Sequence, residues 1–196
     1  MALLENIQTN HATFLENLSH RFLDEQRKCS LQKFEEKGFP TKKDGEYKYT
    51  SLREITEKNY NFFPKEAHHI SKEQIAELHL GEENFDWIVF VNGQLHKELS
   101  KISIENVELL SFNFALNDPK HKDVFDQYFN KIADQNLAFT NLNTAYCKMG
   151  FFLKVPKNMV IEKPIHVFYI SQNQDGNTIY NTRNLLIAEE GSKIEV

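Results

Sequence analysis

With 196 residues, the chain is long enough to bury the core of one domain or of two. Its composition, with 40% hydrophobic and 26% charged residues and sixteen phenylalanines, is typical of a globular protein and argues against a disordered chain. The net charge of −5 and the lack of a sustained basic stripe argue against nucleic acid as a partner.

The sequence shows no sign of secretion or of membrane insertion. Met1 to Leu4 lacks the charged start and the continuous apolar stretch of a signal peptide, and no apolar run approaches the roughly 20 residues of a membrane span. Cys29 and Cys147 are too few and too far apart for a disulfide framework or a CxxC pair. We therefore expect a cytoplasmic protein with no membrane partner.

Residue patterns predict three helices in the first 81 residues. Between His11 and Leu23 the apolar residues recur at intervals of three and four, as on one face of an amphipathic helix; they are Phe14, Leu15, Leu18 and Phe22. A second helix, whose apolar positions are Leu31 and Phe34, should end just before Gly38, which tolerates a positive φ. Ser71 and Gln74 have the spacing of a capping box, opening a short helix that Gly81 could end.

A small sheet is expected around residues 86–112. Asp86 to Val91 is apolar on both faces after its first residue, and Asn92-Gly93 follows directly. This dipeptide favours the positive φ angles of a tight hairpin turn. Further on, Ile102 and Ile104 alternate with polar neighbours, which is typical of a strand.

Two more helices are predicted before Gly150. Asp118-Pro119 is typical of a helix start, since proline lacks an N–H that would be unpaired there anyway. The apolar face of this helix comprises Val124, Phe125, Tyr128, Phe129 and Ile132. After a break at residues 134–136, a shorter helix is expected to run up to Gly150; its apolar residues are Leu142, Ala145 and Tyr146.

After Gly150 the pattern changes from helical to extended. Alternating apolar residues predict a strand over 151–155, which a Pro156-Lys157-Asn158 turn ends, and further strands near 160–169 and 185–188. Leu153, Val155 and the turn after them have a faint echo about 32 residues later, at Leu185, Ile187 and the following turn. Such a repeat suits a β-solenoid, although a β-sandwich would give nearly the same local pattern.

The stretch from Gly38 to Leu52, GFPTKKDGEYKYTSL, resembles a signature of the SufD branch of the SufB/SufD family of iron-sulfur cluster assembly scaffold proteins. It departs from the family pattern at Tyr47, where tryptophan is expected, and at Gly45, where a second acid is usual. Met149 likewise stands where aspartate is favoured. Further stretches resemble the family in the same order; they are Val89 to Gly93 with Leu99-Ser100, Phe139 to Gly150, Val155 to Ile165, and Leu186 to Ser192.

The resemblance implies an α+β chain. Residues 1–150 would form a mainly helical N-terminal domain with a small sheet, and residues 151–196 would start a right-handed parallel β-helix. In the family, the β-helix pairs with a SufB-like subunit, and a C-terminal helical domain binds a SufC-like ATPase. The family's cluster-handling residues lie in later coils. The resemblance therefore assigns no catalytic, cofactor-binding or metal-binding residue to this chain.

Several residues could suggest a metal site or acid-base catalysis, but an ordinary structural or solvent-exposed position fits each of them better. His68 and His69 are adjacent, which is poor geometry for two ligands of one metal, so we expect a solvated loop. His166 is expected on a strand, facing solvent or a partner. The acids Asp44 and Glu46 lie in a polar stretch without signs of the burial that shifts a pKa. Neither Cys29 nor Cys147 is expected to be an iron ligand, because cluster sites usually recruit several cysteines.

The favoured function is that of a non-catalytic scaffold subunit in iron-sulfur cluster assembly, of which this chain would be the N-terminal fragment. The fragment is expected to bind no cofactor, and the complete complex would handle the cluster. A β-helix carbohydrate-active enzyme and a plain protein-interaction module are the alternatives. The missing signal peptide and the lack of an acidic cluster after Gly150 argue against the enzyme.

The last residues predict an open edge. Ile194 and Val196 still alternate with polar neighbours and no closing turn follows them. A β-helix cut between coils exposes backbone groups that pair readily with another chain. We therefore expect the fragment to form a homodimer or larger assembly through such edges, unless the final strands fray or fold back.

Overall fold

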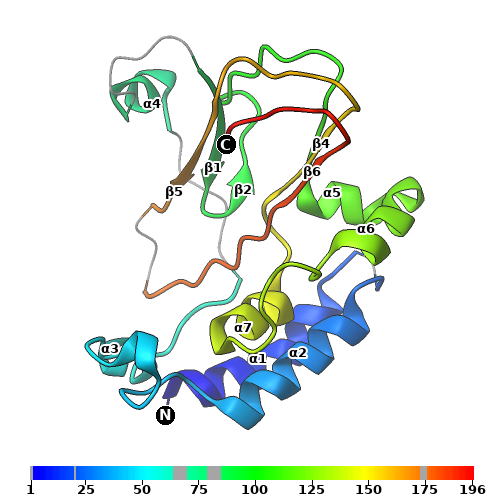
Figure 1. Cartoon of the computed structure of the whole chain (residues 1–196). Helices are drawn as coiled ribbons and strands as arrows, with labels where there is room; N and C mark the ends of the chain where they lie inside the picture. Colours follow the sequence, from blue (N-terminus) through cyan, green and yellow to red (C-terminus); the bar gives the residue numbers. More distant parts are fainter. Residues whose placement is uncertain (1, 20, 64–69, 79–84, 173–175) are drawn as a thin grey trace. The chain divides into compact units, whose positions relative to one another are not determined.

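The computed structural model describes residues 2–19, 21–63, 70–78, 85–172 and 176–196 (Figure 1). The chain forms two compact units, each assembled from three separate stretches. Unit 1 comprises Met1–Pro64, Leu116–Lys148 and Gln174–Arg183, and unit 2 comprises Lys65–Ala115, Met149–Asn173 and Asn184–Val196. Helices and small sheets occur together, so the expected α+β class is confirmed. The division into domains 1–150 and 151–196 stays a prediction.

The described residues contain helices that are mostly short and strands of two to six residues. The helices are α1 (Ala2–Glu16), α2 (Asp24–Lys37), α3 (Arg53–Thr56), α4 (Lys72–Leu78), α5 (Phe112–Asn117), α6 (Lys122–Tyr128) and α7 (Ala138–Tyr146), with 3-10 turns η1 (Gly45–Tyr47) and η2 (Pro119–His121). The strands are β1 (Asp86–Val91), β2 (Gln94–Leu95), β3 (Glu108–Ser111), β4 (Phe151–Val155), β5 (Ile165–Ile170) and β6 (Leu185–Ala188). Among these residues, no helix is long and apolar enough to span a membrane.

Unit 1 is built around a helical core in which α2 packs along α7 and α1 also contacts α7 (Figure 1). The buried residues come from α1, α2, α7 and the stretches after α1, α2 and α3; they include Leu3, Ile7, Phe14, Phe34, Phe39, Phe62, Leu142 and Tyr146. Tyr146 is in the centre, with ring centroids 4.5 Å from Phe62 and 5.0 Å from Phe14. Aromatic packing of this kind contributes beyond the area it buries.

Most predicted helices are confirmed, with corrected ends. The helix expected at 11–23 is wrong in its limits, because α1 starts at Ala2 and ends at Glu16. The Asn17 side chain donates to the Thr13 carbonyl at 2.9 Å, a local hydrogen bond that competes with further helix formation. Helix α2 ends at Lys37 as predicted, and Gly38 has φ +72°.

The two helices expected between 118 and 150 also end earlier than predicted. Pro119 begins a 3-10 turn, and the Asp118 side chain accepts a hydrogen bond from the Lys120 N–H at 3.1 Å, so the predicted start is confirmed. Helix α6 ends at Tyr128, and Ile132, expected on its apolar face, is 98% exposed. Helix α7 ends at Tyr146 instead of reaching Gly150.

Unit 2 contains two three-stranded sheets, in the orders β2-β1-β5 and β3-β4-β6. Strands β1 and β4 contribute to one core through Ile88, Phe90, Phe151, Leu153 and Val155. The other face of β1 packs against α4 in a second core that contains Val89, Val91 and Ile75. This arrangement explains why the sequence of β1 is apolar on both faces.

The predicted turn after β1 is confirmed, and the sheet expected over 86–112 is confirmed in part, since β1 pairs with β2 and Trp87 forms an antiparallel bridge with Lys101. Asn92 and Gly93 have φ angles of 50° and 79° and join β1 to β2. However, β3 pairs with β4, and the other neighbour of β1 is β5. Residues 101–103 still lie beside β1, where the buried Asp86 carboxylate accepts hydrogen bonds from the N–H and the hydroxyl of Ser103. The chain turns away after them, at Asn106, whose φ is 62°.

Residues 184–195 stack in parallel on residues 151–165. Strand β6 pairs with β4, and Val160 and Lys193 form a further parallel bridge. The turns between these pairs correspond as well, since Asn158 and Gly191 have φ angles of 60° and 72° and the Asn158 N–H donates to the Glu190 carbonyl at 3.0 Å. The repetition noticed in the sequence is therefore present in three dimensions.

The predicted alignment of this repeat was wrong by one residue. Leu153 pairs with Leu186, whereas the sequence echo aligned it with Leu185. A shift of one residue moves each side chain to the other face of a strand. Leu186 therefore lies on the face of the buried Leu153 but is itself 37% exposed, while Ile187 on the other face is buried.

Candidate functional site

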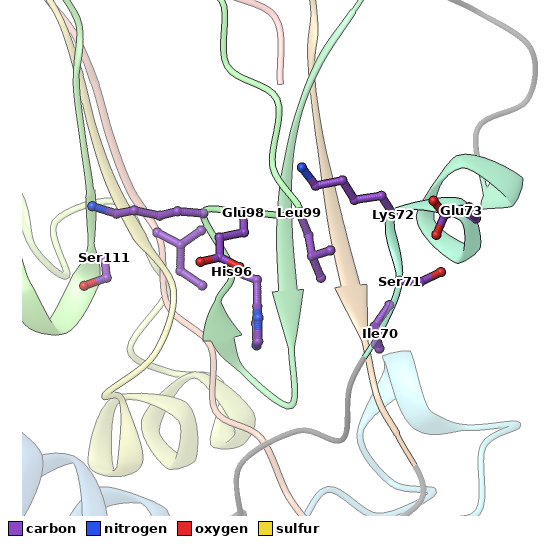
Figure 2. A pocket seen from close by; sticks show the side chains of 10 residues that line it. Ile70, Ser71, Lys72, Glu73, His96, Glu98, Leu99 and Ser111 are labelled. Carbon is purple, nitrogen blue, oxygen red and sulfur yellow. The ribbon is translucent and has the colours of Figure 1, made fainter.

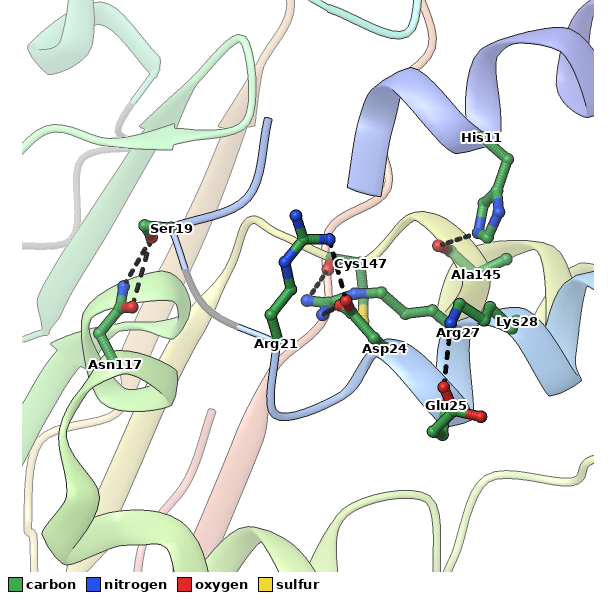
Figure 3. A network of polar contacts seen from close by, with 10 residues as sticks. All are labelled: His11, Ser19, Arg21, Asp24, Glu25, Arg27, Lys28, Asn117, Ala145 and Cys147. Atoms are coloured by element: carbon green, nitrogen blue, oxygen red, sulfur yellow. Dashed lines mark hydrogen bonds and ion pairs between the residues drawn. The ribbon is translucent and has the colours of Figure 1, made fainter. Parts of the chain in front are cut away.

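Among the described residues, two charged side chains belong to fully buried residues, Asp86 in unit 2 and Arg27 in unit 1 (Figure 3). Arg27 has the longer-range contacts. Its Nη2 donates to the Cys147 carbonyl at 2.9 Å, and its Nη1 lies 3.5 Å from Asp24 Oδ1. The second oxygen of Asp24 accepts a hydrogen bond from Arg21 at 3.1 Å. The guanidinium thus ties α2 to the backbone at the end of α7, which is a structural role.

The two cysteines lie in different environments. Cys29 is exposed on α2, whereas Cys147 is buried directly after α7. Burial raises the pKa of the Cys147 thiol, which keeps it protonated at neutral pH. Since iron binds the thiolate, the local chemistry disfavours Cys147 as a ligand. That neither cysteine binds iron stays a prediction.

The neutral side chain of His11 connects α1 to α7 (Figure 3). Its Nε2 lies 3.1 Å from the Ala145 carbonyl oxygen, and its ring meets that of Tyr146 edge-on at 5.2 Å. Burial lowers the pKa of His11. The Tyr146 hydroxyl donates to the Ile7 carbonyl, and burial raises the pKa of Tyr146 as well. This cluster therefore holds two neutral polar rings inside a helical core.

An open hollow of about 910 Å³ lies in unit 2, beside the start of α4 (Figure 2). Ser71 and Gln74 form the predicted capping box at this start, with reciprocal hydrogen bonds of 3.0 and 3.3 Å. The end of this helix, which was expected at Gly81, lies outside the described residues. The lining residues are Ile70, Ser71, Lys72, Glu73, Leu95, His96, Lys97, Glu98, Leu99 and Ser111. Two lysines and two glutamates give the hollow no dominant charge. It offers no recognisable ligand chemistry.

None of the described residues forms a group of three or more His, Cys, Asp or Glu side chains that could hold a metal ion. His68 and His69 lie outside the described residues. His166 is on β5 and exposed, as expected for a strand residue, and its ring stacks on Phe85 with centroids 4.0 Å apart. Asp44 and Glu46 are exposed, so the interpretation as solvated acids is confirmed.

The Asp44 carboxylate has a local structural role. It accepts hydrogen bonds from the N–H and the hydroxyl of Thr41, at 2.8 and 3.2 Å. These hydrogen bonds lower the pKa of Asp44, and the one from the backbone N–H of Thr41 has the larger effect. An acid stabilised in its charged form is a weak proton donor at neutral pH, which argues against acid catalysis by Asp44.

Sequence reasoning missed two arginines with central structural roles. Arg27 stands among exposed charged residues of α2, and no local signal distinguishes it. Arg183 donates to the side-chain oxygens of Asn130 at 2.7 Å and Asn143 at 3.3 Å, and its guanidinium lies over the Phe129 ring. Burial lowers the pKa of Arg183. Only the long-range contacts reveal both roles.

The SufBD protein N-terminal region family matches residues 3–167. Because this match covers most of the chain, the chain belongs to the SufB/SufD family, and the resemblance noticed in the sequence is confirmed.

Curated relatives agree with this assignment. An iron-sulfur cluster assembly SufBD family protein of Synechocystis is 22% identical over 157 residues, which cover 80% of this chain and 34% of the relative. Another from Staphylococcus saprophyticus is 25% identical, covering 74% of this chain and 31% of the relative. The iron-sulfur cluster assembly protein SufD of Bacillus subtilis is 25% identical, covering 69% and 34%. The chain thus spans about a third of the length of these relatives.

Proposed function

We propose that this chain is the N-terminal part of a SufD-like subunit that serves iron-sulfur cluster assembly in the cytoplasm as a scaffold and not as an enzyme. The observation that carries the proposal is the family match over residues 3–167. The relatives named above are described as iron-sulfur cluster assembly proteins, and one of them is a SufD. The signature at Gly38 to Leu52 favours the SufD branch.

We also propose that residues 151–196 begin a right-handed parallel β-helix. The parallel pairing of β4 with β6 supports this, as do the stacked turns at Asn158 and Gly191. Ion pairs also connect the two layers, with Lys154 Nζ 2.9 Å from a Glu189 carboxylate oxygen and Lys157 paired to Glu190. Successive layers that repeat both strand and turn are what a solenoid requires.

The chain itself would bind no cofactor, and the cluster would be handled by the assembled complex. The low reactivity expected of the buried Cys147 thiol supports this, because a cluster ligand needs an accessible thiolate. A chain that contributes shape and binding surface fits a scaffold better than a catalyst.

The partners would be a SufB-like and a SufC-like subunit. The test is co-expression of a tagged protein that carries this chain as its N-terminal region together with both candidate partners. We expect all three to copurify, whereas this chain alone should retain no SufC-like subunit. Failure of the three to associate when each is well expressed would contradict the proposal, and tight binding of the SufC-like subunit to this chain alone would contradict the assignment of partners.

A functional readout complements copurification. Deleting the gene in a cell without another assembly route should lower the activity of cluster-containing enzymes, and the protein with both Cys29→Ser and Cys147→Ser should restore it. Normal cluster supply after the deletion would instead favour a plain protein-interaction module.

We further propose that this chain by itself associates through the edge of β6. Among the described residues, β6 is the outer strand of its sheet, and Leu186 on it is 37% exposed. Unpaired strand edges recruit other strands. Light scattering should show a dimer or larger species for the chain, and Leu186→Lys should shift it to monomer. A monomer already in the unmodified chain would refute edge pairing.

A further inference from the structure

Residues 37–49, which include most of the signature stretch, form a turn in unit 1 that hydrogen bonds hold in place. Besides the contacts between Thr41 and Asp44, the Tyr47 N–H donates to the Asp44 carbonyl at 2.8 Å, and the Thr50 N–H donates to the Tyr47 carbonyl at 3.0 Å. The Tyr47 ring lies against Phe139 of α7, with centroids 6.1 Å apart. The turn is therefore fixed to the helical core.

The same turn exposes its next aromatic residue to solvent. Tyr49 is 90% exposed, and the Lys48 ammonium lies 5.3 Å from the centre of its ring. A tyrosine that makes so little contact with its own domain adds little to folding, yet tyrosine is among the residues that contribute most at interfaces. A fixed backbone lowers the entropy that such a side chain loses on binding.

A small hollow adjoins this turn. Its volume is about 200 Å³. Four of its lining residues are apolar or aromatic, namely Pro40, Tyr47, Leu137 and Ala138, and the others are Lys37, Asp44, Gly45 and Glu46. Sites for drug-sized molecules usually enclose about 300–1,000 Å³, so this hollow is too small for a typical cofactor. It has room for one apolar side chain of a bound segment. Leu137 at its edge is 42% exposed and could be covered by such a segment.

The charge of the segment differs in sign from that of the chain. Residues 37–49 contain four lysines and two acids, a net charge of +2, in a chain whose net charge is −5. The Asp44 carboxylate already accepts two hydrogen bonds from Thr41. Lys42, Lys43 and Lys48 are exposed. The turn therefore attracts negative charge more strongly than the chain as a whole does.

We propose that this surface, formed by Pro40, Lys43, Tyr47, Lys48, Tyr49 and Leu137, is a docking site for an acidic protein segment with an apolar side chain. The apolar side chain enters the hollow beside Tyr47. The carboxylates of the segment meet the exposed Lys43 and Lys48, which do not line the hollow, and keep away from Asp44 and Glu46, which do. The ring of Tyr49 covers the segment from outside. This inference does not rest on the proposed role in cluster assembly, because the partner is defined by its chemistry alone.

The test uses the whole chain and a fluorescent peptide that repeats the triplet glutamate-aspartate-leucine. Fluorescence anisotropy should show saturable binding that weakens as salt rises, because the lysine contacts are exposed. A peptide with serine in place of leucine should bind about tenfold more weakly or worse, and one with lysine in place of both acids should not bind. Tyr49→Ala should also weaken binding about tenfold or more, as should the double change of Lys43 and Lys48 to glutamate.

Matched controls separate this site from general charge effects. Lys193→Glu removes an exposed lysine from unit 2, and Tyr128→Ala removes a tyrosine that is 42% exposed on α6; neither should change peptide affinity more than about twofold. Circular dichroism should show that Tyr49→Ala keeps its fold, since that side chain is 90% exposed. Lack of peptide binding, equal losses in the control variants, or binding of anionic lipid vesicles without peptide binding would each overturn the proposal.

Discussion

The turn at Gly191 is where one substitution tests the stacked layers of unit 2 most directly. Gly191 has φ +72°, and a Cβ atom there would lie 2.4 Å from Asn158 Oδ1 in the layer below. An alanine at positive φ costs about 1–2 kcal/mol. The close approach adds about 1 kcal/mol, because the Asn158 side chain must leave its favoured rotamer. We therefore expect Gly191→Ala to lower the free energy of unfolding by about 2–3 kcal/mol.

Gly176 provides a control. It has a φ of +87°, and a Cβ atom there would meet nothing within 4 Å. Gly176→Ala should therefore lower the free energy of unfolding only by the backbone part, about 1–2 kcal/mol. The difference between the two variants measures the contact between the layers.

Urea unfolding followed by circular dichroism measures both free energies. Adding Asn158→Gly to Gly191→Ala should remove the clash and recover at least about 0.5 kcal/mol in a double-mutant cycle. Equal losses at Gly191 and Gly176, or additive effects of Gly191→Ala and Asn158→Gly, would refute the stacking of these turns.

Three more predictions concern unit 1. Arg27→Ala should lower the free energy of unfolding by about 3–5 kcal/mol, because it leaves buried partners without a donor. Arg21→Ala removes a side chain that is 61% exposed and should cost less than about 1 kcal/mol. Similar losses for the two variants in urea unfolding would contradict this. A thiol reagent should label Cys29 in the native chain but Cys147 only after denaturation, and mass spectrometry distinguishes the two. Because the pKa of His11 is lower in the folded than in the unfolded chain, the unfolded chain binds more protons. Stability should therefore be full above about pH 6.5 and fall below it, and His11→Gln should reduce that fall; an unchanged pH profile in this variant would show that other groups cause it.

Local residue chemistry determined several elements of this protein without help from the rest of the chain. Helix α2 ends before Gly38, and the hairpin after β1 turns at Asn92-Gly93, as the sequence predicts. The capping box of α4 forms between Ser71 and Gln74. In each case a few adjacent residues restrict their own φ angles or supply their own hydrogen bonds, so no distant partner is needed. The family signature is likewise a local feature.

Tertiary structure alone decided which segments meet. An apolar strand such as β1 can pair with any other strand, and its neighbour β5 is identified only by the folded arrangement. The same holds for the register that pairs Leu153 with Leu186 and not with Leu185, since both alignments of the repeat are apolar. Arg27 is buried because α7 presents the Cys147 carbonyl to it, while similar charged residues of α2 remain in solvent. Such outcomes depend on contacts between residues far apart in the chain, which the periodicity of a single segment does not specify.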